Sequence, residues 1–368
     1  MRILVNIDEL GPRHGVAVQT FQVSRELARR GHAVDVVYLR SGAFEPEYRA
    51  FADRVVRVPA LSFGRRPLQA HRIFRSIVIG ARLRPDVIYD NLLWSLPWSA
   101  SVARLTRAGL LGNMHGFSAS EPSAVTRFFI LKTARRVICV SEHARAQLLA
   151  IGVDPATVEV VHNGIDPAAY PVGGRPELEA HRRALGLPLD AFVVVSLGRI
   201  DRMKGVETLL EAARLTSRDG LELVFAGAPV SEEYLAEARR LADGLRCHWL
   251  PSQADVVPLL HAADLVAVPS LFETESFGRV AIEGFATGRP VVASRTGGLV
   301  EVFTGDFERF LFPRGDSAAL AAEIDALRDW RRDEPELAER CAEHVRRNFD
   351  VSAAVDRIEA ELVAAARR

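Results

Sequence analysis

The stretch Phe192–Gly205 reads FVVVSLGRIDRMKG, and VETLLEA continues it to residue 212. The run Phe192–Leu197 predicts a buried strand, because a strand covered by helices on both faces is apolar along its whole length. Gly198 starts a turn, and the apolar spacing over 206–213 predicts a helix after it. A strand, a turn and a helix in succession are the repeating unit of a doubly wound α/β domain.

The same unit recurs from one end of the chain to the other. The first half has apolar runs at Ile3–Ile7, Val34–Leu39, Val55–Val58, Val87–Tyr89, Leu110–Met114, Val137–Val140 and Val158–Val161. The second half adds Leu221–Ala226, Cys247–Leu250, Leu265–Val268 and Val291–Ala293. Amphipathic stretches lie between them, such as the one carrying Val16, Val23 and Leu27. This alternation predicts an α/β fold with two doubly wound, Rossmann-like parallel sheets.

The chain has 368 residues, which is too long for one ordinary core and predicts two domains. The densest group of prolines and glycines lies between Asp166 and Pro188, and we place the domain boundary there. Asn348-Phe349-Asp350 interrupts a helical pattern near the end of the chain. A last helix is expected from about Ser352 to Ala366.

Composition narrows the functional class. The formal net charge is zero, so the charge of the whole chain does not favour nucleic acid or an anionic membrane as a partner. Three widely separated cysteines without a CxxC pair argue for a reducing compartment and against a zinc site. The short apolar run at the N-terminus does not resemble a signal peptide, and no stretch of about twenty apolar residues is present. We therefore expect a cytoplasmic protein.

Ligands of doubly wound sheets bind beyond the carboxyl ends of the strands, so the turns there should carry the chemistry. After the strand ending at Leu197, Arg199 and Lys204 flank a tight turn. A guanidinium can bind a diphosphate in a bidentate fork, and an ammonium can bind it as a point charge. The alternative is that both are solvated surface charges.

The strand Leu265–Val268 leads into a turn and helix that contain Glu275 and Glu283. Seven residues separate these two acids, which along a helix corresponds to about 12 Å. That spacing suits a sugar at one end of a pyrophosphate and a ribose at the other, with carboxylates accepting hydroxyl hydrogen bonds. The backbone amides of Phe277 and Gly278 would face the phosphates or the sugar. The alternative is two exposed glutamates, against which the apolar neighbours of Glu283 argue.

Two glycine turns complete the candidate site. Gly297 and Gly298 follow the strand Val291–Ala293, and a glycine pair that opens a helix forms a backbone cradle for an anion. Gly15 opens the first predicted helix and would let the backbone approach a ligand. Each can equally be an ordinary turn.

Taken together, these stretches resemble retaining glycosyltransferase family 4, whose fold is the two-Rossmann GT-B fold. The resemblance rests on "HNGID" (162–166), "SLGRIDRMKGVETLLEA" (196–212), "LVFAG" (223–227), "AADLVAVPS" (262–270), "ESFGRVAIEGFATGRPVVAS" (275–294), "TGGLVEV" (296–302) and "VICVSEHAR" (137–145). It covers nearly the whole chain. It implies an acceptor domain, 1–170 completed by helix 351–368, facing a donor domain, 171–350, across a cleft.

The resemblance also implies roles for individual residues. Arg199 and Lys204, with Gly198 at the turn, would hold the donor diphosphate and stabilise the leaving nucleotide in place of a metal. Glu275 would contact the donor sugar, Glu283 the ribose, and Gly297 and Gly298 the phosphates. His115, in "NMHGFS", would lie near the reaction centre, although a lone histidine at a strand end is more often structural. Glu273 is a competitor of Glu275, and the usual paired glycines of the first loop are reduced to Gly15.

For the reaction, the resemblance implies transfer of a hexose or N-acetylhexosamine from a UDP-sugar with retention of configuration and without a metal cofactor. The acceptor would be a small polar molecule such as an aminocyclitol, a sugar or a sugar phosphate. Candidate acceptor contacts are Asp8, Glu9, Arg13, His14, Asn91, Trp94, Trp98, Phe117 and Glu121. The protein would work as a monomer or homodimer.

Eight arginines and no acid lie between Arg54 and Arg84, and part of this stretch is helical in pattern. We favour a surface helix that packs one face on the sheet over a helix that lies on anionic lipid. Two rival functions share the predicted fold: a nucleotide-sugar epimerase, and a sugar-nucleotide binding protein without activity. A membrane-surface glycosyltransferase with a lipid acceptor is a further alternative.

Overall fold

The computed structural model describes residues 1–367 except 12–14, 63–66, 117–123, 134–135 and 218. The chain forms two compact units. Unit 1 consists of Met1–Gly164 with Val351–Arg368, and unit 2 of Ile165–Asp350. The division falls at the start of the Asp166–Pro188 stretch in which we placed the boundary.

Most of that stretch is not a linker. It contains helix α7, Arg175–Leu185, within unit 2. Pro176 stands in the first turn of the helix, where its missing N–H has no intrahelical partner to lose, and Gly186 ends the helix in the left-handed conformation. Much of the density of prolines and glycines therefore marks the two ends of a helix, and the domain boundary lies before it.

Unit 1 is built on a seven-stranded parallel sheet in the order β3-β2-β1-β4-β5-β6-β7. Its strands are β1 (Arg2–Glu9), β2 (Ala33–Arg40), β3 (Arg54–Arg57), β4 (Val87–Asp90), β5 (Gly109–Met114), β6 (Val137–Cys139) and β7 (Val158–Val160). Its helices are α1 (Gly15–Arg29), α2 (Glu45–Phe51), α3 (Pro67–Arg82), α4 (Leu96–Thr106), α5 (Ala124–Thr133), α6 (Glu142–Ala150) and α15 (Val351–Ala366).

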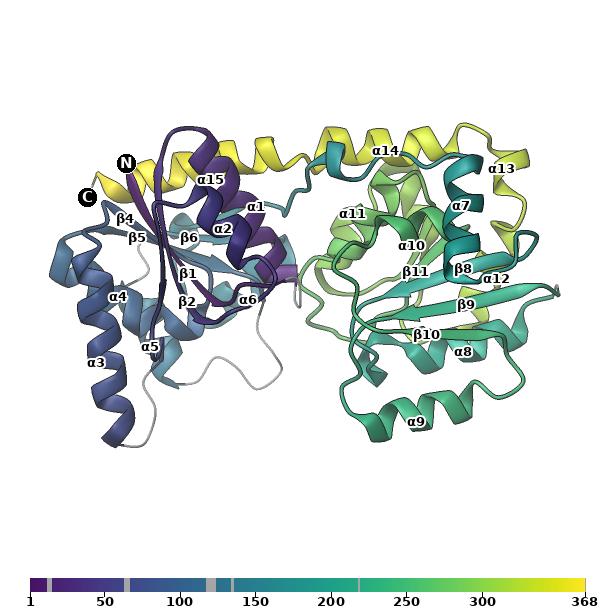
Figure 1. The fold of residues 1–368 in the computed structure, drawn as a ribbon, viewed down its shortest axis with the longest axis horizontal. Coiled ribbons are helices and arrows are strands. Elements are labelled where there is room, and N and C mark those ends of the chain that lie inside the picture. The colour runs from purple at the N-terminus through teal and green to yellow at the C-terminus, as the bar shows by residue number, and fades with distance from the viewer. Residues whose placement is uncertain (12–14, 63–66, 117–123, 134–135, 218, 368) are drawn as a thin grey trace. The chain divides into compact units, whose positions relative to one another are not determined.

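Helices cover both faces of this sheet, as the apolar strand sequences predict (Figure 1). Along β1, Ile3, Val5 and Ile7 pack into a core that includes residues of α1 and α15. Leu4, between them, points to the other face and joins the core made with α3 and α4. Because successive side chains of a strand alternate between faces, a strand buried on both sides has no polar side to show in its sequence.

Helix α15 brings the end of the chain back to unit 1. Val355, Ile358 and Leu362 are buried in the same core as β1. Glu359 accepts a hydrogen bond from Arg30 at 2.8 Å and lies 2.7 Å from Nε2 of His32. Apolar burial and an ion-pair cluster thus both join this last helix to the first part of the chain.

Unit 2 has a six-stranded parallel sheet in the order β10-β9-β8-β11-β12-β13. Its strands are β8 (Phe192–Leu197), β9 (Leu221–Ala226), β10 (Cys247–Leu250), β11 (Leu265–Val268), β12 (Val291–Ser294) and β13 (Leu311–Phe312). Its helices, besides α7, are α8 (Val206–Leu215), α9 (Glu232–Leu241), α10 (Val257–Ala262), α11 (Arg279–Ala286), α12 (Ser317–Ala326), α13 (Trp330–Asp333) and α14 (Leu337–Asn348). Short 3-10 turns include η1 (Leu93–Ser95), η4 (Arg202–Lys204) and η5 (Gly297–Val302).

The predicted α/β class with two doubly wound parallel sheets is confirmed. The twelve predicted strands are all present, four of them with the predicted bounds. The two-residue strand β13 was missed because two residues give no periodic signal. Over the part of the chain that the structure describes, no helix combines the length and the apolar character needed to cross a bilayer.

Candidate active site

The order of the strands in unit 2 defines where a ligand should bind. The chain places β9 and β10 on one side of β8, then returns to place β11 on the other side. This reversal leaves a crevice at the carboxyl ends of β8 and β11, where ligands of open α/β sheets bind. The turns that follow β8, β11 and β12 therefore meet at one edge of the sheet, and they carry the predicted donor-site residues.

An ion pair between Lys204 and Glu275 lies at this edge. The Nζ atom of Lys204 is 2.7 Å from Oε2 of Glu275, and the hydroxyl of Ser270 donates to the same oxygen at 2.7 Å. Burial acts to raise the pKa of Glu275, but the charge and hydrogen bond of Lys204, the hydroxyl of Ser270 and the charge of Arg199 outweigh it and lower the pKa. Glu275 is therefore a carboxylate at neutral pH, able to accept hydrogen bonds.

Arg199 joins the same group of residues. Its guanidinium is 2.7 Å from the carboxylate of Asp201 and lies 6.0 Å from the centre of the Phe272 ring. The ammonium of Lys204 lies 5.4 Å from the same ring. Both cations lie against the same aromatic ring, and the charge of each lowers the pKa of Glu275, so both are candidates to bind one anion at this place. Leu271 donates its N–H to the carbonyl of Met203, which ties the two turns to each other.

The structure distinguishes Glu275 from its competitor Glu273. The side chain of Glu273 is 77% exposed and pairs with Arg314, whereas that of Glu275 is 13% exposed and pairs with Lys204. Gly298 donates its N–H to the carbonyl of Glu275 at 2.7 Å. A Cβ at Gly297, which has a φ of +50°, would lie 2.2 Å from the same carbonyl. The glycine pair thus fits directly against the backbone of Glu275, and only glycine allows that contact.

Glu283 lies inside α11 and is 7% exposed. Its Oε1 accepts from Nε of Arg279 at 2.8 Å and from the hydroxyl of Tyr170 at 3.1 Å. The expected partner for this buried acid is therefore present. Our description of the two glutamates as residues of one helix was wrong, because α11 begins at Arg279 and Glu275 precedes it in the loop. The helical spacing of about 12 Å consequently does not apply to them.

The remaining donor-site predictions fall on backbone positions. Gly278 is the N-cap of α11 with a φ of +92°, and the Phe277 side chain is buried against Phe349, so only the backbone of Phe277 is available to a ligand. Gly198 follows β8 with a φ of +131° and has open space where a side chain would stand. Gly15, in unit 1, is the first residue of α1 and is exposed.

Unit 1 has its own strand reversal, between β1 and β4, and a buried polar network lies there. The amide of Asn6 donates to Ser95 at 2.7 Å and to Ser99 at 3.3 Å, and its oxygen accepts the N–H of Asn91 at 2.9 Å. Asp90 is fully buried and accepts from Ser95 and from the N–H of Leu92. Sequence reasoning missed Asn6 and Asp90 as members of this network; Asp90 ends β4, and Asn6 is its register partner on β1.

His115 directly follows β5, as predicted from "NMHGFS". Its Nε2 atom is buried and has no hydrogen-bond partner among the described residues. Burial lowers its pKa to about 4, so the imidazole is neutral at physiological pH and one nitrogen can accept a proton or a hydrogen bond. An unpaired buried imidazole nitrogen is costly, which is consistent with a position that a ligand completes.

The predicted acceptor contacts differ in their burial and in their partners. Asp8 and Glu9 both pair with Arg40, at 2.6 and 3.2 Å, so their charge is partly neutralised. Trp94 is partly buried in η1, but Trp98 is a fully buried core residue and the prediction that it contacts an acceptor was wrong. The predicted contacts Arg13, His14, Phe117 and Glu121 lie outside the described residues.

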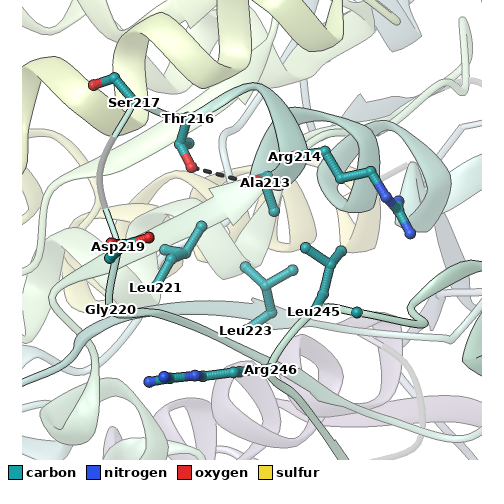
Figure 2. Close-up of a pocket in the computed structure, with 11 residues that line it drawn as sticks. Ala213, Arg214, Thr216, Ser217, Asp219, Gly220, Leu221, Leu223, Leu245 and Arg246 are labelled. Carbon is teal, nitrogen blue, oxygen red and sulfur yellow. Dashed lines mark hydrogen bonds between the residues drawn. The ribbon is translucent and has the colours of Figure 1, made fainter.

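A pocket of about 600 Å³ lies elsewhere on unit 2, at the amino ends of β9 and β10 (Figure 2). Arg214 and Arg246 stand beside apolar side chains of Leu221, Leu223 and Leu245 in this pocket. It is at the opposite end of the strands from Arg199 and Glu275, so it is separate from the donor-site residues. Within the described residues no group of three or more His, Cys, Asp or Glu side chains is arranged to hold a metal ion.

The fold and the residues at its strand ends define a class of enzymes, the glycosyltransferases with two Rossmann-like domains. Residues 13–169 match the model of Glycosyltransferase Family 4, and residues 178–348 match that of Glycosyl transferases group 1. D-inositol 3-phosphate glycosyltransferase of Mycobacterium tuberculosis is 32% identical in an alignment of 323 positions that covers 78% of this chain and 66% of that protein. The chain thus matches about two thirds of the length of its curated relatives.

Solved structures agree with this fold. HepE of Anabaena, in complex with UDP and glucose, has a TM-score of 0.86 at 24% identity over 99% of both chains. Sucrose-phosphate synthase of Thermosynechococcus elongatus has a TM-score of 0.79 at 24% identity, covering 99% of this chain and 100% of that one. The protein belongs to the family 4 glycosyltransferases with the GT-B fold, and the predicted resemblance is confirmed.

Proposed function

We propose that the protein is a retaining glycosyltransferase that moves a hexose or N-acetylhexosamine from a UDP-sugar to a hydroxyl of a small polar acceptor, without a metal cofactor. The observation that carries the proposal is the group formed by Arg199, Lys204 and Glu275 at the strand reversal of unit 2. A sugar diphosphate would fit this group, because the two cations can neutralise the diphosphate and the carboxylate can accept hydrogen bonds from the sugar hydroxyls.

The chemistry follows from charge. As the glycosidic bond breaks, negative charge develops on the diphosphate, and Arg199 and Lys204 would stabilise it from fixed positions. In the free protein Lys204 is paired with Glu275. A bound diphosphate would compete with Glu275 for the ammonium of Lys204. Glu275 would then accept from a hydroxyl of the donor sugar. The neutral imidazole of His115 is suited to accept a hydrogen bond from the sugar or the attacking hydroxyl.

UDP as the nucleotide is supported by the UDP bound to HepE, and a cyclitol phosphate or a sugar phosphate as acceptor by the names of the inositol phosphate and sucrose phosphate enzymes. The second candidate function, epimerisation of the nucleotide sugar, would use the same donor residues. It differs in needing no acceptor.

To test this proposal, the protein is incubated with a set of nucleotide sugars and acceptors, and the products are identified by nuclear magnetic resonance. We expect UDP release that depends on an acceptor, a product with the anomeric configuration of the donor, and the same rate in the presence of a chelator. Inverted product would refute retention, and loss of activity on chelation that magnesium restores would refute metal independence. Conversion of the UDP-sugar to its epimer without acceptor would favour the second candidate.

A further inference from the structure

The zero net charge of the chain is the sum of two opposite charges. Unit 1 contains 25 Lys and Arg against 16 Asp and Glu, whereas unit 2 contains 22 against 31. The excess in unit 1 comes from one span: residues 54–136 carry 14 basic residues and only three acids, Asp86, Asp90 and Glu121. Since charges further apart than about 8 Å are screened at physiological salt, a partner senses this local excess and not the net charge.

One of the three acids in the span, Asp90, contributes nothing to its surface charge; Asp86 is exposed, and Glu121 lies outside the described residues. Asp90 is fully buried, and Asp86 accepts a hydrogen bond from the backbone N–H of Arg2 at the amino end of β4. Arg54 and Arg136 are the basic residues of the span that pair with acids, Asp35 and Glu361 respectively, within the described structure. The other described basic side chains of the span stay without an acidic partner.

Six of these unpaired cations stand on three neighbouring helices. Helix α3 packs on α4, and α4 packs on α5. None of the three helices contains an Asp or Glu in its sequence. The exposed basic side chains on them are Arg72, Arg75, Arg82, Arg104, Arg127 and Lys132. Together α3, α4 and α5 form what we name the basic helical face of unit 1.

Large apolar side chains are exposed on the same helices. Phe74 on α3 is 65% exposed, Leu105 on α4 is 66% exposed, and Phe128 and Leu131 on α5 are 57% and 43% exposed. Along α3, Ile73 and Ile77 are buried against the sheet. With 3.6 residues per turn, Phe74, Arg75 and Arg82 fall on the outward side, so the outer surface of the helix itself mixes apolar and cationic groups.

Helix α3 packs one face on the sheet, as we favoured from the sequence, but its outer face and those of α4 and α5 lead us to the alternative that we did not favour there. We propose that the basic helical face of unit 1 docks on an anionic lipid surface. Arginines without acids are attracted to anionic headgroups, and Phe74 and its apolar neighbours can enter the boundary between headgroups and acyl chains. A nucleic acid would satisfy the arginines through its phosphates but would leave the exposed leucines without a partner. The proposal concerns where the enzyme lies and not what it glycosylates, so it stands or falls independently of the proposed function.

The experiment uses the full-length protein and sedimentation with vesicles of phosphatidylcholine, with and without phosphatidylglycerol. We expect binding that requires phosphatidylglycerol and weakens as salt rises. The double variant Arg72→Glu/Arg75→Glu should bind at least ~30-fold more weakly, since each basic residue near an anionic surface contributes about one factor of five. The matched control is Arg239→Glu/Arg240→Glu, which makes the same charge change on exposed residues of α9 in unit 2.

A third variant, Phe74→Ser, separates lipid from other polyanions. Phe74 is exposed, so its loss should leave folding intact while weakening vesicle binding several-fold. Circular dichroism and the thermal midpoint of each variant check the fold, and UDP-sugar hydrolysis checks the donor site. The proposal is overturned if wild-type protein does not bind phosphatidylglycerol vesicles, if both double variants lose binding equally, or if short RNA binds as tightly as the vesicles and Phe74→Ser changes neither.

Discussion

At the scale of single residues, the candidate donor site depends on compensation of charge. Lys204 is the residue that keeps the buried Glu275 ionised, so changing it removes a donor to the diphosphate and also leaves the carboxylate without its cation. We expect Lys204→Met to lower kcat for donor cleavage by about 100-fold, the usual cost of one charge-stabilising contact.

Arg202→Met is the matched control, because Arg202 lies in the same turn but pairs with Glu207 and Glu237. It should retain near wild-type kcat. Equal rates for wild type and Lys204→Met in steady-state UDP release would remove Lys204 from the site.

His115 gives a prediction on pH. Its pKa falls from the ordinary 6.5 to about 4 in the folded protein, so between these values the unfolded chain takes up a proton that the folded protein does not. Its contribution to stability is therefore complete above pH 6.5 and is lost as the pH falls toward 4. We expect the free energy of unfolding of wild type to fall more steeply over this range than that of His115→Gln.

Chemical denaturation at several pH values measures this difference. The buried His261 and His344, whose pKa values are also lowered by burial, titrate in both proteins and cancel in the comparison. Parallel pH curves for the two proteins would mean that His115 is accessible to protons in the folded state.

At the scale of elements, the loop before α11 and the turn after β12 act as one piece. Two hydrogen bonds join them: the N–H of Gly298 donates to the carbonyl of Glu275, and the hydroxyl of Thr296 donates to the carbonyl of Phe272. We expect Gly297→Ala to destabilise the protein by roughly 1–3 kcal/mol through its positive φ and its clash with Glu275, and to lower turnover because Glu275 is displaced.

Gly305→Ala is the matched control for this effect. Gly305 has a φ of +61° but nothing within 4 Å of the position of a Cβ, so it imposes the backbone strain without the clash. Denaturation and kinetics on both variants separate the two causes. Turnover lost equally in both would show that the contact with Glu275 is irrelevant.

At the scale of the whole molecule, the two units should unfold as separate bodies, and α15 belongs to the first of them. Leu362 is fully buried in the core of unit 1. Leu362→Ala should cost about 2–5 kcal/mol in unit 1 alone. In differential scanning calorimetry the transition of unit 1 should move to lower temperature while that of unit 2 stays in place.

Val363→Ala, at the partly exposed neighbouring position, should shift the unit 1 transition far less. A single transition that moves as a whole in Leu362→Ala would show instead that the units unfold cooperatively.

Local sequence was sufficient to predict the strands and to identify the family. Apolar runs such as Phe192–Leu197 are buried when they fold, so these runs predict the strands. In Asp166–Pro188 the prolines and glycines also cap a helix, and local sequence does not distinguish such caps from a linker.

Tertiary structure alone decided which side chains meet. Lys204 and Glu275 are 71 residues apart, and Glu283 and Tyr170 are 113 apart, so no local pattern specifies these pairs. The strand order places β8 beside β11, so the turns that follow these two strands lie close together. In the same way, the pairing of β1 with β4 places Asn6 beside Asp90. The excess of basic residues over 54–136 is visible in the sequence, but only the folded structure shows which of them pair with acids, because electrostatic attraction depends on distance in space and not on distance along the chain.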